Sequence, residues 1–117
     1  MNVRRVVPNI KAERLDESHE FYVEVLGLEQ SMDLGWNATY ASAANPTAQI
    51  SVIVKDATAP EHPDVSVEVE DVDAVHAKAV ERGLEIVHPL TDEPWGVRRF
   101  FVRDPNGKVI NVMAHHR

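Results

Sequence analysis

The sequence contains no cysteine among its 117 residues. Disulfide bridges, thiolate metal ligands and cysteine nucleophiles are therefore excluded, and the composition is compatible with a reducing cytoplasm. Long apolar runs are also missing. No stretch approaches the roughly 20 apolar residues that span a bilayer, and the first residues carry too short an apolar run for a signal peptide. We therefore expect a cytoplasmic protein with no membrane partner.

Basic residues are scarce. Twelve Lys and Arg residues face 19 Asp and Glu residues, which gives a formal net charge of −7. The main local concentration of basic residues is Arg98, Arg99 and Arg103, whereas phosphate contacts need clustered cations. The balance argues against a nucleic-acid partner and favours a positively charged ligand.

Apolar residues are present in ordinary amounts. The chain is 44% hydrophobic and 26% charged, which is typical of a folded globular protein. A length of 117 residues allows one domain but not two independent cores.

The first half predicts a strand, a helix and three further strands. Residues 3–10 are β-prone, and residues 16–26 carry an apolar stripe at helical spacing before Gly27, which suits a helix end. Strand character then returns over three segments, residues 28–32, 36–43 and 49–54.

The second half repeats this order after a connector. Residues 56–63 are rich in proline and small side chains, so we expect them to be exposed. A strand over residues 65–69 and a helix over 71–82 follow. The last three predicted strands are residues 84–87, 97–102 and 109–113, with the turn Asp104-Pro-Asn-Gly107 between the final two.

The two halves form an internal repeat. Val25-Leu-Gly-Leu-Glu29 aligns with Glu81-Arg-Gly-Leu-Glu85, each at a helix end that leads into a strand. We predict an α+β domain of two βαβββ modules, about 1–55 and 64–117. Neither module can bury its sheet face alone, so each needs the other or a second chain.

Three motifs fall in register with the repeat: Phe21-Tyr-Val-Glu-Val-Leu-Gly-Leu28, Val69-Glu-Asp-Val-Asp73, and Pro94-Trp-Gly-Val-Arg-Arg-Phe-Phe-Val-Arg-Asp-Pro-Asn-Gly107. Together they resemble the vicinal oxygen chelate superfamily over essentially the whole chain. That superfamily includes glyoxalase I, extradiol dioxygenases, epimerases, fosfomycin-resistance enzymes and bleomycin-binding proteins, and the Trp-Gly-x-Arg segment is most similar to the bleomycin-resistance branch. The resemblance implies a curved sheet around a cleft, and a homodimer whose subunits can exchange elements.

Catalytic members of that superfamily bind a divalent metal through His, Glu or Gln. The resemblance places the corresponding positions at Val7, Ser51, Asp64 and Asn111. Only Asp64 is a good ligand for a hard cation, and a catalytic site needs about three protein ligands. The six histidines, His116 in the tail included, form no recognisable metal motif. We therefore expect no metal and no cofactor, with a metal held by other ligands as the alternative.

Strand alternation assigns one face of each terminal strand to the cleft. With aromatic residues that can stack on a planar ring added, the predicted ligand-binding cleft comprises Val7, Asn9, Trp36, Tyr40, Gln49, Ser51, Asp64, Ser66, Trp95, Asn111 and Met113. Trp36 and Tyr40 are equally compatible with a core or dimer-interface role. The alternation also separates Arg99 and Arg103 from Arg98, and for these arginines we expect salt bridges or turn anchoring, with attraction of an anionic substrate as the alternative.

Two functional hypotheses follow. The first is a metal-free protein that sequesters a planar aromatic compound, such as an antibiotic, without turnover. The second is an enzyme: a metal-dependent lyase or dioxygenase, or a metal-free isomerase with Asp64 or Glu68 as general base. A vestigial cleft, or one that serves a partner protein, is the third possibility, since fold alone does not fix function.

Overall fold

The structure is a computed structural model that describes residues 2–115. Its contacts divide the chain into two compact units. We call Val7–His62 the first unit, and Pro63–Arg117 together with Met1–Val6 the second unit. The long strand β1 (Val3–Lys11) contributes residues to both.

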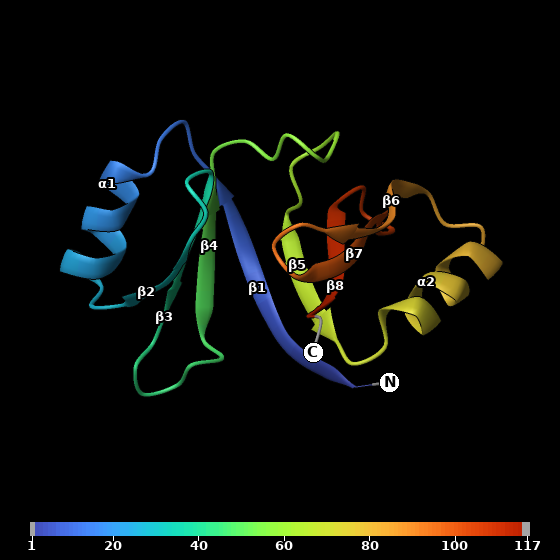
Figure 1. Cartoon of the computed structure of the whole chain (residues 1–117), viewed down its shortest axis with the longest axis horizontal. Coiled ribbons are helices and arrows are strands. Elements are labelled where there is room, and N and C mark those ends of the chain that lie inside the picture. Colours follow the sequence, from blue (N-terminus) through green and yellow to red (C-terminus); the bar gives the residue numbers. More distant parts are fainter. Residues whose placement is uncertain (1, 116–117) are drawn as a thin grey trace. The chain divides into compact units, whose positions relative to one another are not determined.

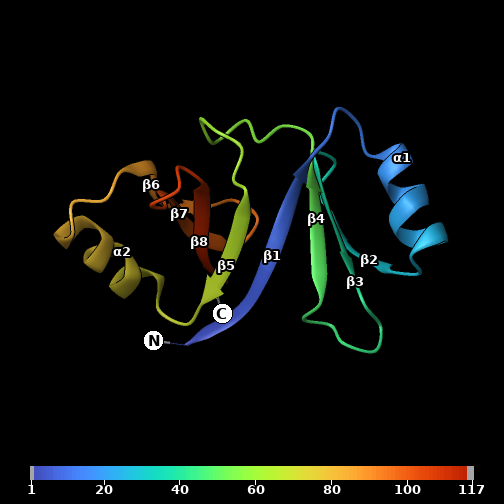
Figure 2. The ribbon, with the colours of Figure 1, turned by 180° about the vertical axis from the view of Figure 1, so that it is seen from behind.

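In the first unit, β1 is followed by the short helix α1 (Asp16–His19), which continues as a π-helical segment, η1 (Glu20–Val25). Three strands complete the unit: β2 (Glu29–Asp33), β3 (Asn37–Ala41) and β4 (Gln49–Ile53). The strands lie in the order β2-β3-β4-β1, with β1 parallel to β4 and the other pairs antiparallel. Figures 1 and 2 show β1 and β4 side by side from both directions.

The second unit repeats the order. It contains β5 (Val65–Val69), α2 (Val72–Glu81), β6 (Ile86–Glu93), β7 (Val97–Arg103) and β8 (Val109–His115). Its strands lie in the order β5-β8-β7-β6, with β5 parallel to β8 and the N-terminal part of β1 next to β5. The predicted α+β class and the βαβββ repeat are therefore confirmed.

Strand β6 differs most from its predicted range. The sequence predicts a strand over 84–87, but β6 begins at Ile86 and continues through Pro89 to Glu93. Its pairing with β7 shifts between His88 and Thr91. β6 is an edge strand, and a proline is tolerated there because its missing N–H removes no interior ladder bond.

The helices are anchored unequally. α2 begins at Asp71, whose side chain accepts a hydrogen bond from the Ala74 amide, and its apolar side packs on Phe100 and Val112. The α1–η1 helix has no side-chain cap and no fully buried residue, and only its Leu15–Val23 side packs on the sheet. No helix within residues 2–115 is long and apolar enough to cross a membrane.

Candidate functional site

Each unit has one sheet face that its own helix does not cover, which we call its helix-free face. In β8, Val112 and Ile110 pack toward α2, so Asn111 and Met113 lie on the opposite face. The predicted alternation along β8 is therefore correct. In β5 it is also correct, because Val67 and Val69 pack in the same core.

The helix-free face of the first unit carries a row of small polar side chains. Asn9 pairs with Ser51 across the parallel strands β1 and β4, and Ser51 pairs with Thr39 on β3. The Thr39 and Ser51 hydroxyl oxygens lie 2.8 Å apart and share a hydrogen bond. We call Asn9, Ser51 and Thr39 the first polar row; all three are buried.

The second unit has a matching row. Ser66 pairs with Asn111 across β5 and β8, Asn111 pairs with Phe101, and Phe101 pairs with His88. Asn111 Nδ2 donates to Ser66 Oγ over 3.0 Å. Asn111 Oδ1 is buried and has no hydrogen-bond partner among the described residues. We call Ser66, Asn111, Phe101 and His88 the second polar row.

The two rows reflect the repeat. Each parallel strand pair carries one asparagine and one serine on its helix-free face, in exchanged order. Four of these residues were predicted as cleft residues: Asn9, Ser51, Ser66 and Asn111. Sequence reasoning missed Thr39, Phe101 and His88, because it assigned cleft faces only on the terminal strands. The antiparallel pairing of β3 with β4, and of β7 with β8 and β6, would have placed these residues beside the predicted ones.

A buried charged cluster lies beside the second polar row. Arg99 donates through Nε and Nη2 to Glu93 Oε2, each over 2.6 Å, and His88 Nε2 lies 3.2 Å from the same oxygen. The Arg99 guanidinium also lies 5.0 Å from the Trp95 ring centroid and 4.8 Å from that of Phe101. Stacking and the carboxylate together compensate for the desolvation of Arg99, which is 4% exposed.

The other two arginines are structural, as expected. Arg98 pairs with Asp73 and Asp92, and the Arg98 contact holds the pKa of Asp73 below its usual value. Arg103 pairs with Glu85 and donates to the Gly107 carbonyl of the β7–β8 turn.

Tyr40 does not belong with the predicted cleft residues. It is 0% exposed and lies in the core of the first unit, on the opposite face from Ser51 and stacked on Tyr22. Burial, with Asp33 and Tyr22 nearby, raises the pKa of its phenol. The core role that the sequence left open is the one observed.

The two tryptophans lie outside the strand interiors. Trp36 is half-buried and directly precedes β3, where the sequence predicted that it would begin the strand. Trp95 is half-buried in the β6–β7 turn, and one face of its ring lies on Arg99.

Both candidate bases are held by structural contacts. Asp64 Oδ2 accepts a hydrogen bond from the Val109 amide at 2.8 Å, which fixes the start of β5 against β8. Glu68 accepts hydrogen bonds from Arg5 and from His115. Burial alone raises the pKa of Glu68, but these two partners outweigh it and hold the pKa below its usual value.

Three predicted cleft residues remain: Val7, Gln49 and Met113. Val7 and Met113 are buried, and Gln49 donates to the Pro46 carbonyl over 2.7 Å. His116 lies outside the described residues.

The four positions that correspond to family metal ligands do not fit a divalent ion. Val7 has no donor atom, Asp64 is bound to a backbone amide, and the amide of Asn111 donates to Ser66. Ser51 shares a hydroxyl hydrogen bond with Thr39. Within residues 2–115, no group of three His, Asp or Glu side chains is arranged to hold a metal.

Comparison with models of known families identifies the family of this chain. The Glyoxalase/Bleomycin resistance protein/Dioxygenase superfamily model matches residues 8–112. The chain belongs to this superfamily. No curated protein sequence matches.

Solved glyoxalase-superfamily structures share the fold. A superfamily member from Vibrio splendidus 12B01 is 18% identical with a TM-score of 0.71, covering 97% of this chain and 99% of the other. Methylmalonyl-CoA epimerase from Streptomyces coelicolor is 16% identical with a TM-score of 0.74, covering 99% and 100%. An extradiol ring-cleaving dioxygenase from B. fuscum is 20% identical with a TM-score of 0.70, covering 99% and 34%. At these identities the likeness concerns the fold alone.

Proposed function

We propose that this protein binds a small planar compound, such as an aromatic antibiotic, at the second polar row, without a metal and without turnover. The observation that carries the proposal is the unpartnered Oδ1 atom of Asn111. Buried polar atoms are nearly always hydrogen-bonded, and an exception needs a reason. A ligand N–H or O–H that donates to Asn111 Oδ1 would supply that reason.

The surroundings of Asn111 favour a flat ligand. Phe101 follows Asn111 in the row, and its ring already lies against the planar guanidinium of Arg99. Aromatic faces with few, well-placed polar groups are typical of small-molecule sites. Since Asn111 is only 7% exposed, a ligand reaches it only when the covering residues move, so we expect association slower than diffusion.

The state of the carboxylates supports binding over proton transfer. A general base needs a free lone pair near the proton that it removes, with a pKa close to the working pH. Glu68 has its pKa held below the usual value by Arg5 and His115, and Asp64 is bound to the Val109 amide. Neither has the environment of a carboxylate base.

The donor set supports metal-independent binding. The superfamily's metal chemistry requires several anionic or imidazole ligands, whereas Val7, Ser51 and Asn111 offer one alkyl, one hydroxyl and one amide group. The binding energy must therefore come from hydrogen bonds and apolar contact.

A fluorescence titration tests this proposal. We would screen planar aromatic compounds carrying N–H or O–H groups by the change in tryptophan emission, with and without EDTA, and recover the compound afterwards. We expect one site per chain, unaffected by EDTA, and an unchanged compound. Asn111→Leu should weaken binding by about tenfold, as expected when a buried acceptor is lost.

The matched control is Asn37→Leu. Asn37 also has a buried Oδ1 atom without a described partner, but it lies in neither polar row. Equal losses in both variants, loss of binding in EDTA, or a chemically altered compound would each contradict the proposal.

A further inference from the structure

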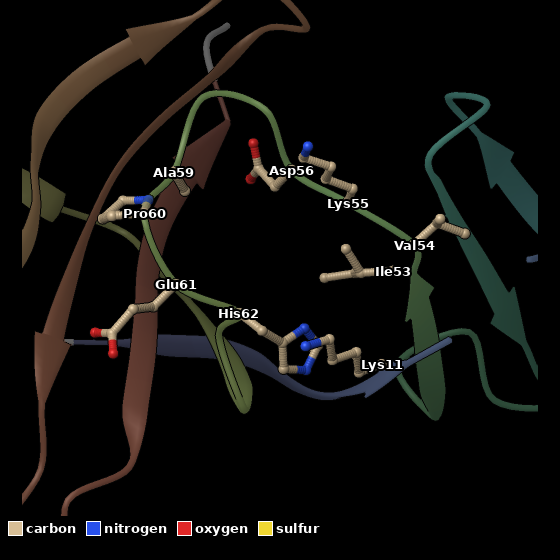
Figure 3. A pocket seen from close by; sticks show the side chains of 9 residues that line it. All are labelled: Lys11, Ile53, Val54, Lys55, Asp56, Ala59, Pro60, Glu61 and His62. Atoms are coloured by element: carbon tan, nitrogen blue, oxygen red, sulfur yellow. The ribbon is translucent and has the colours of Figure 1, made fainter. Parts of the chain in front are cut away.

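The first unit contains a pocket at the ends of its two parallel strands. It has a volume of about 180 Å³ and lies between the last residues of β1 and β4 and the connector that follows β4 (Figure 3). Its lining includes Lys11, Ile53, Lys55, Asp56, Glu61 and His62. Lys11 pairs with Ile53, and the first polar row lies two residues back along the same strands. The pocket therefore adjoins the polar helix-free face of its own unit.

Two lysines line this pocket, together with the carboxylates of Asp56 and Glu61. The chain has only four lysines, and Lys11 and Lys55 are two of them. Within residues 2–115, neither ammonium has an ion-pair or hydrogen-bond partner, whereas Arg5, Arg98 and Arg99 are all paired with carboxylates. Two like charges beside one pocket repel each other, and an anion between them would remove that repulsion.

The acidic residues of the lining are used elsewhere. Asp56 Oδ1 accepts hydrogen bonds from the Thr58 amide at 3.0 Å and from the Thr58 hydroxyl at 2.7 Å, which forms the turn of the connector. Figure 3 shows the Glu61 carboxylate pointing away from Lys11 and Lys55. The carboxylates thus leave the two ammonium groups available.

His62 holds the connector over the pocket. Its Nε2 lies 3.1 Å from the backbone carbonyl oxygen of Asn9, and it must donate because that oxygen can only accept. The contact fixes the proton on Nε2 and ties the connector, with Lys55 at its start, to the strand that ends at Lys11.

From this arrangement we infer a binding site for a compact anionic group, a phosphate or a carboxylate, held between the Lys11 and Lys55 ammonium groups. Lysine binds such oxyanions as a point charge, so the site selects charge more than shape. The inference is independent of the proposed function, because every residue that it uses belongs to the first unit, whereas Asn111 belongs to the second unit.

The test is a titration of the full-length protein with inorganic phosphate and, separately, with sodium acetate at constant ionic strength. Binding is followed by calorimetry and by backbone amide shifts in NMR. We expect one saturable site, with the largest shifts in residues 53–62. The anion that binds more tightly identifies the group as phosphate or carboxylate.

The decisive variant is Lys11→Gln combined with Lys55→Gln, with Lys78→Gln combined with Lys108→Gln as the control of equal charge change. The first pair should weaken binding at least about tenfold, and the control should change it less than about twofold. Circular dichroism checks the fold of both variants. No saturable binding of either anion, unchanged affinity in the Lys11/Lys55 variant, or an equal loss in the control would overturn the inference.

Discussion

The second unit buries charged side chains, whereas the buried polar side chains of the first unit, Asn9, Thr39 and Ser51, are neutral. In the second unit, Glu93 lies between Arg99 and His88 in the interior, and Glu68 joins Arg5 to His115. In the first unit, Arg14 forms exposed ion pairs with Asp16 and Glu17. The same βαβββ order can therefore be stabilised by different chemistry in two halves of one chain.

The helix of the second unit is also more firmly anchored than the helix of the first unit. α2 has a capping aspartate and a ten-residue length, and it buries Val72 and Ala79. The α1–η1 helix has neither a cap nor a fully buried residue, and Val25 is 68% exposed on it. Local opening is cheapest where buried apolar contacts are few, so we expect the first unit to be the more easily deformed.

The largest expected effect is loss of the buried cation in the second unit. Arg99→Ala leaves Glu93 buried without its main partner, so the free energy of unfolding should fall by about 3 to 5 kcal/mol. Arg98→Ala is the matched control, because its partners Asp73 and Asp92 are exposed, so its loss should cost far less. Urea unfolding measures both. Similar losses in the two variants would show that burial of charge does not distinguish the second unit.

A smaller, pH-dependent effect should come from Glu68. Its pKa is lower in the folded protein than the ordinary value of 4.5, so its stabilisation is complete above that value and is lost as the pH falls through the folded pKa. Glu68→Gln should cost about 1 to 3 kcal/mol at pH 7, and progressively less as the pH falls below 4.5 toward the folded pKa. Thermal unfolding across this range gives the comparison. A loss that stays constant with pH would mean that the Arg5 and His115 contacts do not depend on the charge of Glu68.

The smallest expected effect lies in the first unit. Tyr40 Oη is buried and has no hydrogen-bond partner among the described residues. Tyr40→Phe removes that unsatisfied hydroxyl and keeps the ring stacked on Tyr22, so stability should stay within about 0.5 kcal/mol or rise by up to about 1 kcal/mol. Urea unfolding measured as for Arg99→Ala checks this. A loss of stability above about 1 kcal/mol would show that the hydroxyl has a partner. Buried polar contacts would then stabilise the first unit as they stabilise the second.

Much of the fold follows from local sequence signals. Gly27 and Gly83 adopt positive φ values of 75° and 69° at the helix ends, where the predicted helices stop. Alternation along β5 and β8 placed Ser66 and Asn111 on the correct face. Successive side chains of a strand point to opposite faces of the sheet, so one known buried residue fixes the faces of the others. These features depend on neighbours in sequence.

The parts that were missed depend on neighbours in space. Tyr40 has the polar edge and flat ring of a ligand contact, and only its stacking on Tyr22 shows that it belongs to the core. His88 lies just beyond the predicted strand over 84–87, and only the shifted pairing with β7 brings it beside Phe101. That Lys11 and Lys55 have no partner within residues 2–115 likewise emerges only from the tertiary arrangement.

The division of β1 has a consequence for how the units can fold. Residues Val3–Val6 belong to the unit that otherwise starts at Pro63, so that unit is complete only when residues from both halves of the sequence are present. A fragment cut at the connector would lack Arg5 and leave Glu68 without that cation. Although the repeat resembles two joined copies, the second unit therefore depends on a strand segment that the start of the first half supplies.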